Sequence, residues 1–213
     1  MKPAFDVDCR QCPRLSGFLD SVKEKYPDYY CRPVPPFGDR EAQFVIVGLA
    51  PGLHGANRTG RPFTGDHAGI LLYQMLYKHG FSNQEESISA DDPLILGNCR
   101  ITNAVKCLPP DNKPVGAEIN TCNQFLAAEL DAIKNSSVVM ALGGIAHRAI
   151  IKALGLRQAD YKFGHAAEHE LPGRFLMLDS YHCSRYNTNT RRLTEPMFDA
   201  IFVRAREILQ AGR

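Results

Sequence analysis

FVIVGLAPGLHGANRTGRPFTGD, residues 44 to 66, is the stretch that decides the fold. It opens with an unbroken apolar run, Phe44 to Val47, and continues into a loop, residues 48 to 66, that holds five glycines and two arginines and ends on Asp66. A continuous apolar run is typical of a strand covered on both faces, as in a parallel sheet. Glycines in the loop let backbone N–H groups approach a ligand closely. The stretch therefore predicts a buried strand that leads into a binding loop.

Three more segments are predicted to be strands: Arg100–Lys106, Val138–Leu142 and Phe175–Leu178. The first of them is more polar than the other two. Helix-length segments with apolar spacing near 3.6 lie between and after them: 69–79, 117–134, 145–154 and 195–210. Strands that alternate with helices indicate an α/β fold with helices on both faces of the sheet. We expect a single domain over residues 1–213, because the chain shows no repeat, linker or low-complexity tract.

The composition is that of a globular protein, with 44% hydrophobic and 23% charged residues, and it argues against disorder. The net charge of +2 gives no global basic character, so a nucleic-acid partner would have to be met by a local patch. The start, MKPAFDVDC, has no apolar signal region, and no run approaches the roughly 18 apolar residues of a membrane helix. We expect a soluble cytoplasmic protein of prokaryotic type, with no membrane partner.

The segments of unusual composition all follow predicted strands. They are the loop after residue 47, KCLPPDNKP at 106–114, Gly143-Gly144, and SYHCSRYNTNTRRLT at 180–194. In open α/β sheets, ligands bind beyond the carboxyl ends of the strands. The pattern therefore predicts one site built from these segments.

Seven cysteines suggest metal or redox chemistry in an intracellular chain. Cys9 and Cys12 form a C-x2-C pair, Cys107 is expected to end a strand, and Cys122 to lie in a helix. Four thiolates suit zinc or an iron–sulfur cluster, and the spacing alone does not choose between them. The alternative is that Cys107 and Cys122 are small buried hydrophobes. We interpret the other three as ordinary residues: Cys31, Cys99 and Cys183.

Residues 55–62 nearly satisfy the phosphate-loop pattern G-x4-G-K-[ST]. The pattern fails at its two decisive positions, because Arg61 replaces the lysine and Pro62 replaces the hydroxyl residue that would hold magnesium. A nucleotide-dependent enzyme is therefore the weakest interpretation of the loop.

The loop closely resembles motif 1 of the family 5 (B-type) uracil-DNA glycosylases, in which GLAP replaces a more polar motif. HCSRYNTNT at 182–190, followed by Leu193-Thr194, resembles motif 2 of the same family. CPRL at 12–15 and VKCLPPDNKP at 105–114 match its cluster-binding pattern. The resemblance runs from Cys9 to Thr194, and it departs from the usual motif 2 at Cys183 and Arg185-Tyr186, which concerns substrate preference more than activity.

The resemblance implies a three-layer α/β/α fold with a central four-stranded parallel sheet. It also implies a [4Fe–4S] cluster held by Cys9, Cys12, Cys107 and Cys122. We expect this cluster to be structural, because binding at a site absent from the unfolded chain becomes folding free energy, of order 10 kcal/mol. It would tie an N-terminal arm, about residues 1–40, to the core.

The resemblance further implies a DNA-repair glycosylase that flips uracil, and other deaminated or damaged bases, out of the stack and hydrolyses the N-glycosidic bond. His182 can donate to the base oxygen as negative charge develops. Phe63 can stack on the base, and the Asn103 amide can pair with its Watson–Crick edge. Each of these residues has a structural alternative. His182 could be a histidine whose hydrogen bonds are all made within the protein, Phe63 a core aromatic residue, and Asn103 an asparagine that stabilises a turn.

Other family members carry Asp or Asn where this chain has Ala50, which can neither orient water nor stabilise a sugar cation. Asp66 is the nearest carboxylate in the same loop, and we assign both tasks to it. The alternative is that Asp66 is the N-cap of the helix that follows. Ala50 also leaves space, so we expect some breadth of substrate.

Between His182 and Arg192 there are three arginines and no acid, which favours phosphate contacts, with an ordinary solvated loop as the alternative. Arg185 or Tyr186 could fill the gap left by the flipped base. We expect the base to be contacted by Gly48, Leu49, Ala50, Phe63, Asn103 and His182. We expect the DNA strand, single or double, to be contacted by His54, Asn57, Arg58, Ser184, Arg185, Tyr186, Asn187, Thr188 and Thr190.

The competing hypothesis is a non-catalytic iron–sulfur protein that binds DNA or senses redox state. Asp66 discriminates the two, because Asp66→Asn should abolish turnover in a glycosylase and leave a binding module unaffected. We expect a monomer, since a base-flipping enzyme engages one nucleotide.

Overall fold

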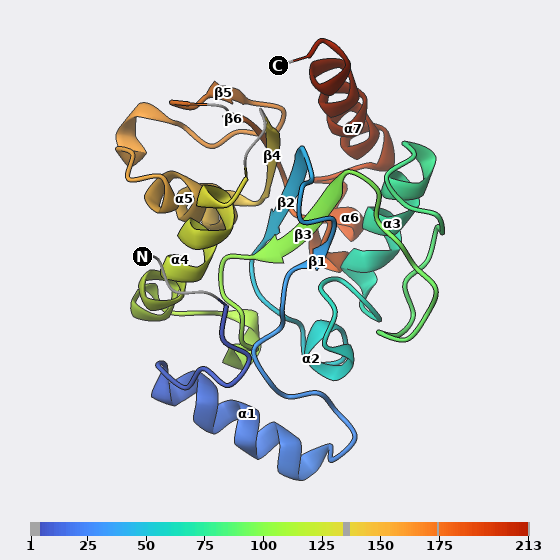
Figure 1. The fold of residues 1–213 in the computed structure, drawn as a ribbon. Helices are drawn as coiled ribbons and strands as arrows, with labels where there is room; N and C mark the ends of the chain where they lie inside the picture. The colour runs from blue at the N-terminus through green and yellow to red at the C-terminus, as the bar shows by residue number, and fades with distance from the viewer. Residues whose placement is uncertain (1–4, 134–136, 174, 213) are drawn as a thin grey trace.

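The core of the molecule is a mixed sheet of six strands in the order β1-β3-β2-β4-β6-β5 (Figure 1). The computed structural model describes residues 5–133, 137–173 and 175–212. Four central strands run parallel: β2 (Phe44–Gly48), β3 (Cys99–Asn103), β4 (Ser137–Leu142) and β6 (Phe175–Ser180). Two short edge strands, β1 (Phe37–Gly38) and β5 (Glu168–Glu170), pair antiparallel.

The four predicted strands are confirmed as the parallel centre, but the expectation of a purely parallel four-stranded sheet is wrong. The edge strands have two and three residues, too few for a period-2 pattern to stand out in the sequence. The strand predicted at 100–106 begins at Cys99 and ends at Asn103, so Cys107 lies in the loop beyond the strand and does not end it.

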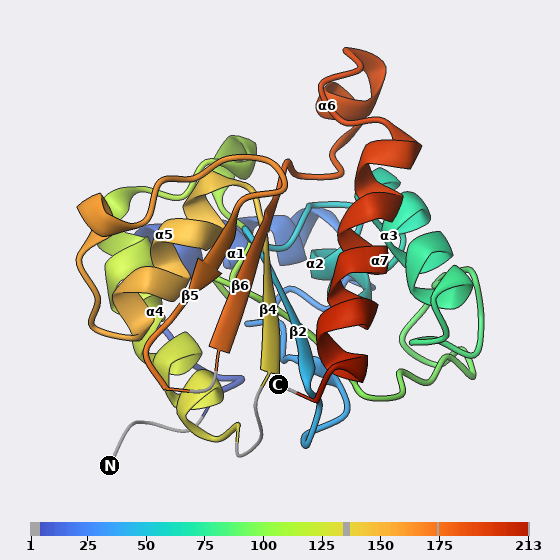
Figure 2. The same cartoon turned by 90° about the horizontal axis from the view of Figure 1, so that it is seen from above.

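The sheet is the middle of three layers, and alternating side chains on its strands face opposite helix pairs. Ile46 and Met140 pack with the helices α3 (His67–Lys78) and α7 (Glu195–Gln210). Val47 and Ala141 pack with α4 (Gly116–Asp131) and α5 (Gly144–Ala153). Figure 2 shows the two helix pairs on opposite sides of the strands. Burial on both faces explains why the strand sequences are continuously apolar.

The four predicted helices are present with small shifts at their ends. The helix predicted over 117–134 spans Gly116–Asp131, and Lys134 lies outside the described residues. The sequence interpretation missed α1 (Pro13–Lys25), α2 (Ala56–Thr59), α6 (Arg185–Asn189) and the 3-10 turns Pro110–Asn112 and Gln158–Asp160.

The first helix, α1, closes the N-terminal arm onto the core. Its residues Leu15, Leu19 and Val22 are buried, and Leu19 and Val22 pack with Leu108 from the loop after β3. Arg14 donates from Nε and Nη2 to the two carboxylate oxygens of Glu118 on α4, each at 2.7 Å. The arm is therefore attached by packing and a bidentate ion pair in addition to any metal group.

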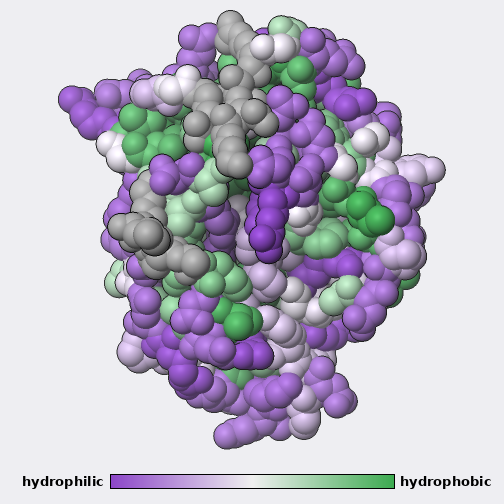
Figure 3. Space-filling model, viewed as in Figure 1, coloured by the Kyte–Doolittle hydropathy of each residue, from purple (hydrophilic) through white to green (hydrophobic). Residues whose placement is uncertain are grey.

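The described helices include none that is both long and apolar enough to cross a membrane. On the face drawn in Figure 3, hydrophobic residues gather in small separate patches among hydrophilic ones. Most of the large apolar side chains lie inside, in the two layers between the sheet and the helices.

Candidate active site

A cavity of about 480 Å³ opens beyond the carboxyl ends of β2, β3, β4 and β6. Its wall combines the segments that the sequence marked: Leu49, Ala50, Gly52, Ala56, Phe63, Asp66, His67, Ala68, Asn103, Asn112, Leu142, Gly143, Gly144, Ile145, His182, Ser184 and Arg185. The volume suits one small organic group. The convergence follows from the parallel sheet, whose central strands all deliver their following loops to one edge.

Gly48, the last residue of β2, has no room for a side chain. A Cβ atom there would lie 2.6 Å from Cζ of Phe63 and would also strike Oδ1 of Asn103. Phe63 is buried, and its φ of 55° is in the left-handed region that bulky residues avoid. Backbone of this kind persists only where its surroundings enforce it. The pocket thus holds an aromatic ring at a defined place over the end of β2.

Asn103 ends β3, and its side chain lines the cavity at 3% exposure. Its Oδ1 atom has no hydrogen-bond partner among the described residues. Buried polar atoms are almost always paired, and an unpaired one costs about 1–3 kcal/mol. An amide left open inside a pocket is therefore placed to recognise a ligand, which favours the binding role over the tying of a turn.

Asp66 is an N-cap and also a residue of the cavity wall. Its Oδ1 accepts from the N–H of Gly69 at 2.9 Å, which makes it the N-cap of α3, and the side chain also lines the cavity. Burial raises the pKa of Asp66, and N–H donation from Gly69 and Ala68, together with His67 nearby, opposes that rise. A raised pKa at a pocket carboxylate is typical of a group that exchanges protons.

His182, just beyond β6, lies beside Phe63 in the cavity wall. The two ring centroids are 5.9 Å apart and the ring planes are inclined by 28°. Burial lowers the pKa of His182 to about 4, so the ring is neutral at pH 7 and one nitrogen donates while the other accepts. The backbone is fixed by Asn187, whose Nδ2 donates to the His182 carbonyl at 2.8 Å.

The short helix α6 carries most of the predicted DNA contacts. Ser184 caps it by accepting from the N–H of Asn187. Arg185 lines the cavity mouth, and Tyr186 stands out with 72% of its surface exposed. Oγ1 of Thr188 and Nε2 of His67 share a hydrogen bond of 3.2 Å, and this bond joins α6 to the start of α3. Thr190, the C-cap of α6, is exposed.

In the loop after β2, the three predicted DNA contacts have different surroundings. Arg58 is exposed, and His54 is exposed but bonded through Nδ1 to the Tyr29 hydroxyl at 2.9 Å. Asn57 contradicts the expectation, because its side chain is fully buried and its Nδ2 donates to Sγ of Cys31 at 3.4 Å. Asn57 therefore ties the loop to the arm and cannot reach DNA.

The sequence interpretation missed two polar residues of the wall, His67 and Asn112. His67 adjoins Asp66 in the same motif, so its position was a usable signal. Asn112 is in the left-handed region with a φ of 56°, a conformation that asparagine adopts more readily than most residues. Gly143, which the sequence marked by its place after a strand, has a φ of 94° and is the N-cap of α5.

The four cysteines predicted as ligands line one small cavity between α1, α4 and the loop after β3. Cys9 and Cys12 precede α1, Cys107 follows β3, and Cys122 lies within α4. Burial raises the pKa of Cys107 to about 12, and neighbouring thiols add to the rise. The backbone N–H of Lys106 donates to Sγ of Cys122 at 3.3 Å. The four thiols share one apolar recess. They can all ionise to thiolates there only if a cationic group binds among them.

The spacing of these thiols tests which group they fit. A single zinc ion, with Zn–S bonds of about 2.3 Å in a tetrahedron, brings its sulfurs to about 3.8 Å from one another. No three of these four described cysteines have sulfurs all within 4.8 Å of one another. The four sulfurs are therefore spread more widely than the ligands of one zinc ion.

The chain matches the family model of the uracil DNA glycosylase superfamily over residues 35–206. It is 44% identical over 205 residues to the type-5 uracil-DNA glycosylase of Thermus thermophilus, covering 94% of this chain and 93% of that protein. It is 42% identical to the type-5 enzyme of Pyrobaculum aerophilum, with coverage of 93% and 88%. The chain therefore belongs to the uracil DNA glycosylase superfamily and, within it, to the type-5 uracil-DNA glycosylases.

More distant relatives agree with this placement. The type-4 uracil-DNA glycosylase of Archaeoglobus fulgidus is 32% identical over 151 residues, which cover 70% of this chain and 62% of that protein. A crystal structure of SMUG2 from Pedobacter heparinus superposes with a TM-score of 0.51 at 13% identity, covering 98% of this chain and 94% of that one. At that identity, the likeness concerns the fold alone.

Proposed function

We propose that this protein excises uracil, and other deaminated or damaged bases, from DNA by hydrolysing the N-glycosidic bond and leaving an abasic site. The observation that carries the proposal is the meeting of Asp66, Asn103 and His182 in one pocket, although they are far apart in the sequence. DNA, single- or double-stranded, is the partner, and one copy of the chain suffices because each pocket takes one nucleotide.

The pocket supplies a role for each part of the reaction. The base enters beside Phe63, and the open amide of Asn103 pairs with its polar edge. As the bond breaks, negative charge moves onto the base, and neutral His182 donates a hydrogen bond to it. Asp66, which also lines the cavity, orients the water and stabilises the positive sugar.

Ala50 is the basis for proposing a broad substrate range. It lines the cavity and packs on its other side against the cluster of buried residues that includes Leu15 and Cys122. A small apolar side chain there neither selects nor excludes a base by hydrogen bonding, so discrimination falls to Asn103 and His182. Ala50→Asp should narrow the range, and a variant that folds yet retains the full range would remove this argument.

We further propose that Cys9, Cys12, Cys107 and Cys122 hold a [4Fe–4S] cluster. When bound, it supplies structural cross-linking of the arm, the loop after β3 and α4. Iron and acid-labile sulfide should be measured in the purified protein, together with the visible absorbance of the cluster. Cys107→Ser should lose iron and lower the melting temperature steeply, whereas Cys99→Ser changes a buried cysteine outside the set and should retain its iron.

The activity test uses an end-labelled duplex with one U opposite G, followed by alkali, with a T·A duplex as control. Strand scission of the U duplex alone, lost in Asp66→Asn, is the expected result. A protein that binds this DNA but leaves no alkali-labile site in uracil or hypoxanthine duplexes would instead be the non-catalytic iron–sulfur protein.

A further inference from the structure

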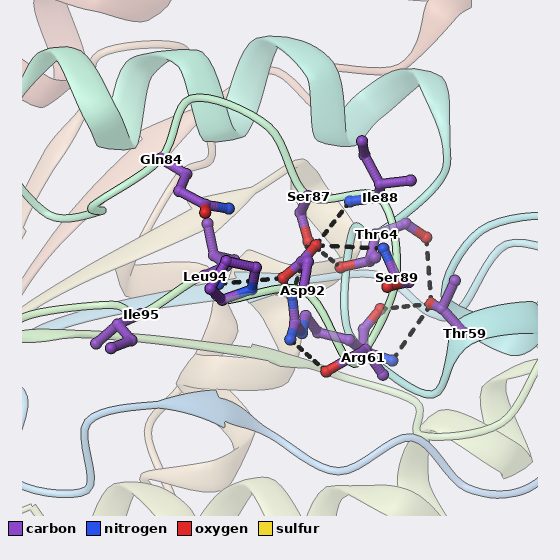
Figure 4. Close-up of polar contacts among 12 residues, drawn as sticks. Thr59, Arg61, Thr64, Gln84, Ser87, Ile88, Ser89, Asp92, Leu94 and Ile95 are labelled. Carbon is purple, nitrogen blue, oxygen red and sulfur yellow. Dashed lines mark hydrogen bonds and ion pairs between the residues drawn. The ribbon is translucent and has the colours of Figure 1, made fainter.

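Arg61 is a buried cation close to the pocket in the chain, and the proposed reaction gives it no role. It is 6% exposed, and its guanidinium lies 4.4 Å from the ring centroid of Phe37. Nη1 donates to Oγ of Ser87 at 3.2 Å and to the carboxylate of Asp92, and Nη2 donates to the carbonyl of Ala90 at 2.6 Å (Figure 4). A guanidinium with donors fixed in this way is part of a built structure and is not available to a phosphate.

Asp92 organises the segment that Arg61 reaches. Its carboxylate accepts from the N–H groups of Ile88 at 2.9 Å, Ser89 at 3.2 Å and Leu94 at 3.2 Å (Figure 4). Burial acts to raise the pKa of Asp92, but Arg61 and these three N–H donors outweigh it, so the pKa is lowered. Residues 87–94 are thus folded around one carboxylate, which is in turn paired with Arg61.

The same segment holds the chain on the far side of Phe63. Oγ1 of Thr64 lies 2.7 Å from Oγ of Ser87, and the N–H of Gly65 donates to the Ser87 carbonyl at 3.3 Å. On the near side, the hydroxyl of Tyr73 donates to the carbonyl of Pro62 at 2.9 Å. Phe63 is therefore clamped by fixed neighbours before and after it.

The clamp matters because Phe63 cannot hold its conformation alone. Its φ of 55° is strained for a bulky side chain, and its carbonyl lies so close to Gly69 that a Cβ there would overlap it. The residues on both sides must supply the constraint that keeps the ring at the pocket. Arg61, Thr64 and Gly65 all bond to the distant segment 87–94, and Arg61 makes the ion pair with it.

We infer that Arg61 and Asp92 are positioning residues that set the place of Phe63 and thereby the stacking of the base. The inference rests on the proposed function, since it takes the base to contact Phe63. It assigns a role in base recognition to residues 87–94. Asp92, in that segment, is 31 residues from Arg61 in the sequence and is not among the residues that line the cavity.

The test is a double-mutant cycle with Arg61→Lys, Phe63→Ala and the double variant, measured as kcat/KM on the U·G duplex. Lysine keeps the charge but not the forked donors. If Arg61 acts through Phe63, Arg61→Lys should lower kcat/KM about 10- to 100-fold in the wild-type background and less than about 3-fold in the Phe63→Ala background. An equal loss in both backgrounds would overturn the inference.

A second readout separates positioning from general damage. Binding to DNA with an abasic site has no base to stack, so Arg61→Lys should leave that affinity within about 2-fold. Ser87→Ala, which removes only one hydroxyl, should reproduce the effect in weaker form if Arg61→Lys fails to fold. Arg204→Lys, which alters the forked pair with Glu168 on the exposed side of α7, is the control and should change neither value.

Failure of the proposed function is distinguishable from failure of this inference. A crystal structure of Arg61→Lys or Ser87→Ala should show Phe63 leaving its left-handed conformation, whatever the enzyme cleaves. Phe63 unmoved in both variants would overturn the inference even if uracil excision is demonstrated. Phe63 displaced in a protein without glycosylase activity would uphold the clamp and refute only the proposed function.

Discussion

In the loop after β2, residues 49–66, Arg61 and Thr64 are buried and their side chains bond to residues 87–92. In the segment after β6, residues 182–192, Arg185 and Tyr186 are exposed. Many hydrogen bonds of this segment join residues three to five apart, such as those from Thr188 and Asn187. The first loop is held by contacts with a distant segment, whereas the segment after β6 exposes its two long side chains and bonds mainly within itself. The difference suits a pocket that must fit one base and a surface that must follow DNA.

The sharpest test of the fixed loop removes its chemistry and keeps its structure. Asp66→Asn should lower the single-turnover rate on a U·G duplex about 10²- to 10⁴-fold, because an amide cannot act as a base. Asparagine caps helices about as well as aspartate, so the melting temperature should hold, as should DNA affinity measured by fluorescence anisotropy. A matching drop in affinity would mean that Asp66 serves binding and not turnover.

The same residue sets the expected pH dependence. Because burial raises the pKa of Asp66 and the ionised form is the active one, the rate should fall with decreasing pH around a midpoint above the ordinary 3.8. His182, whose pKa is about 4, stays neutral above that pH and should add no separate step in the neutral range. A pH–rate profile of wild type and of the residual activity in Asp66→Asn checks this. The variant should lack the acidic limb.

A smaller effect is expected from filling the end of β2. Gly48→Ala would drive a methyl group into Phe63 and Asn103, and overpacking of this kind costs about 1–3 kcal/mol. We expect a lower melting temperature and a raised KM, since both displaced residues face the base. Gly116→Ala is the matched control, because nothing lies within 4 Å of a Cβ at that position. Equal behaviour of the two variants would contradict a tightly built pocket.

For the segment after β6, the expectation is reversed: binding changes and stability does not. Tyr186→Ala should weaken affinity for DNA by about 1–3 kcal/mol if the ring stacks on a base or fills the gap left by the flipped one. The free energy of unfolding should stay within about 0.5 kcal/mol, because the side chain is 72% exposed. Titration of labelled DNA and chemical denaturation measure the two. Tyr77→Ala, an exposed tyrosine near the far end of α3, is the control.

The two regions also differ in how far the sequence could predict them. The central strands were predictable because burial on both faces leaves continuous apolar runs, and Asp66 and His182 were predictable because their motifs are local. The pairing of Arg61 with Asp92 was not, because it joins residues 31 apart in sequence without any periodic pattern. The prediction that Asn57 contacts DNA was wrong for a similar reason, because its burial depends on Cys31, a residue of the N-terminal arm.

The missed helices have a different cause. The helix α1 carried a usable signal, with Pro13 at its first turn and Leu15, Leu19 and Val22 at helical spacing. In contrast, α6 has five residues, too short for its apolar spacing to be recognised, and only its cap at Ser184 marks it. Short elements are defined by what they contact, and that information is not local.

The smallest expected effect concerns the charge of the segment after β6. Arg185 sits at the cavity mouth and is exposed, so a phosphate contact there would release about one counterion. Arg185→Gln should reduce the slope of log affinity against log salt by about 1, uniformly across DNA sequences and for uracil and undamaged duplexes alike. Arg204→Gln, whose guanidinium is already paired with Glu168, should leave the slope unchanged. A loss confined to uracil duplexes would instead place Arg185 at the base, and the second segment would then share the work of recognition with the first.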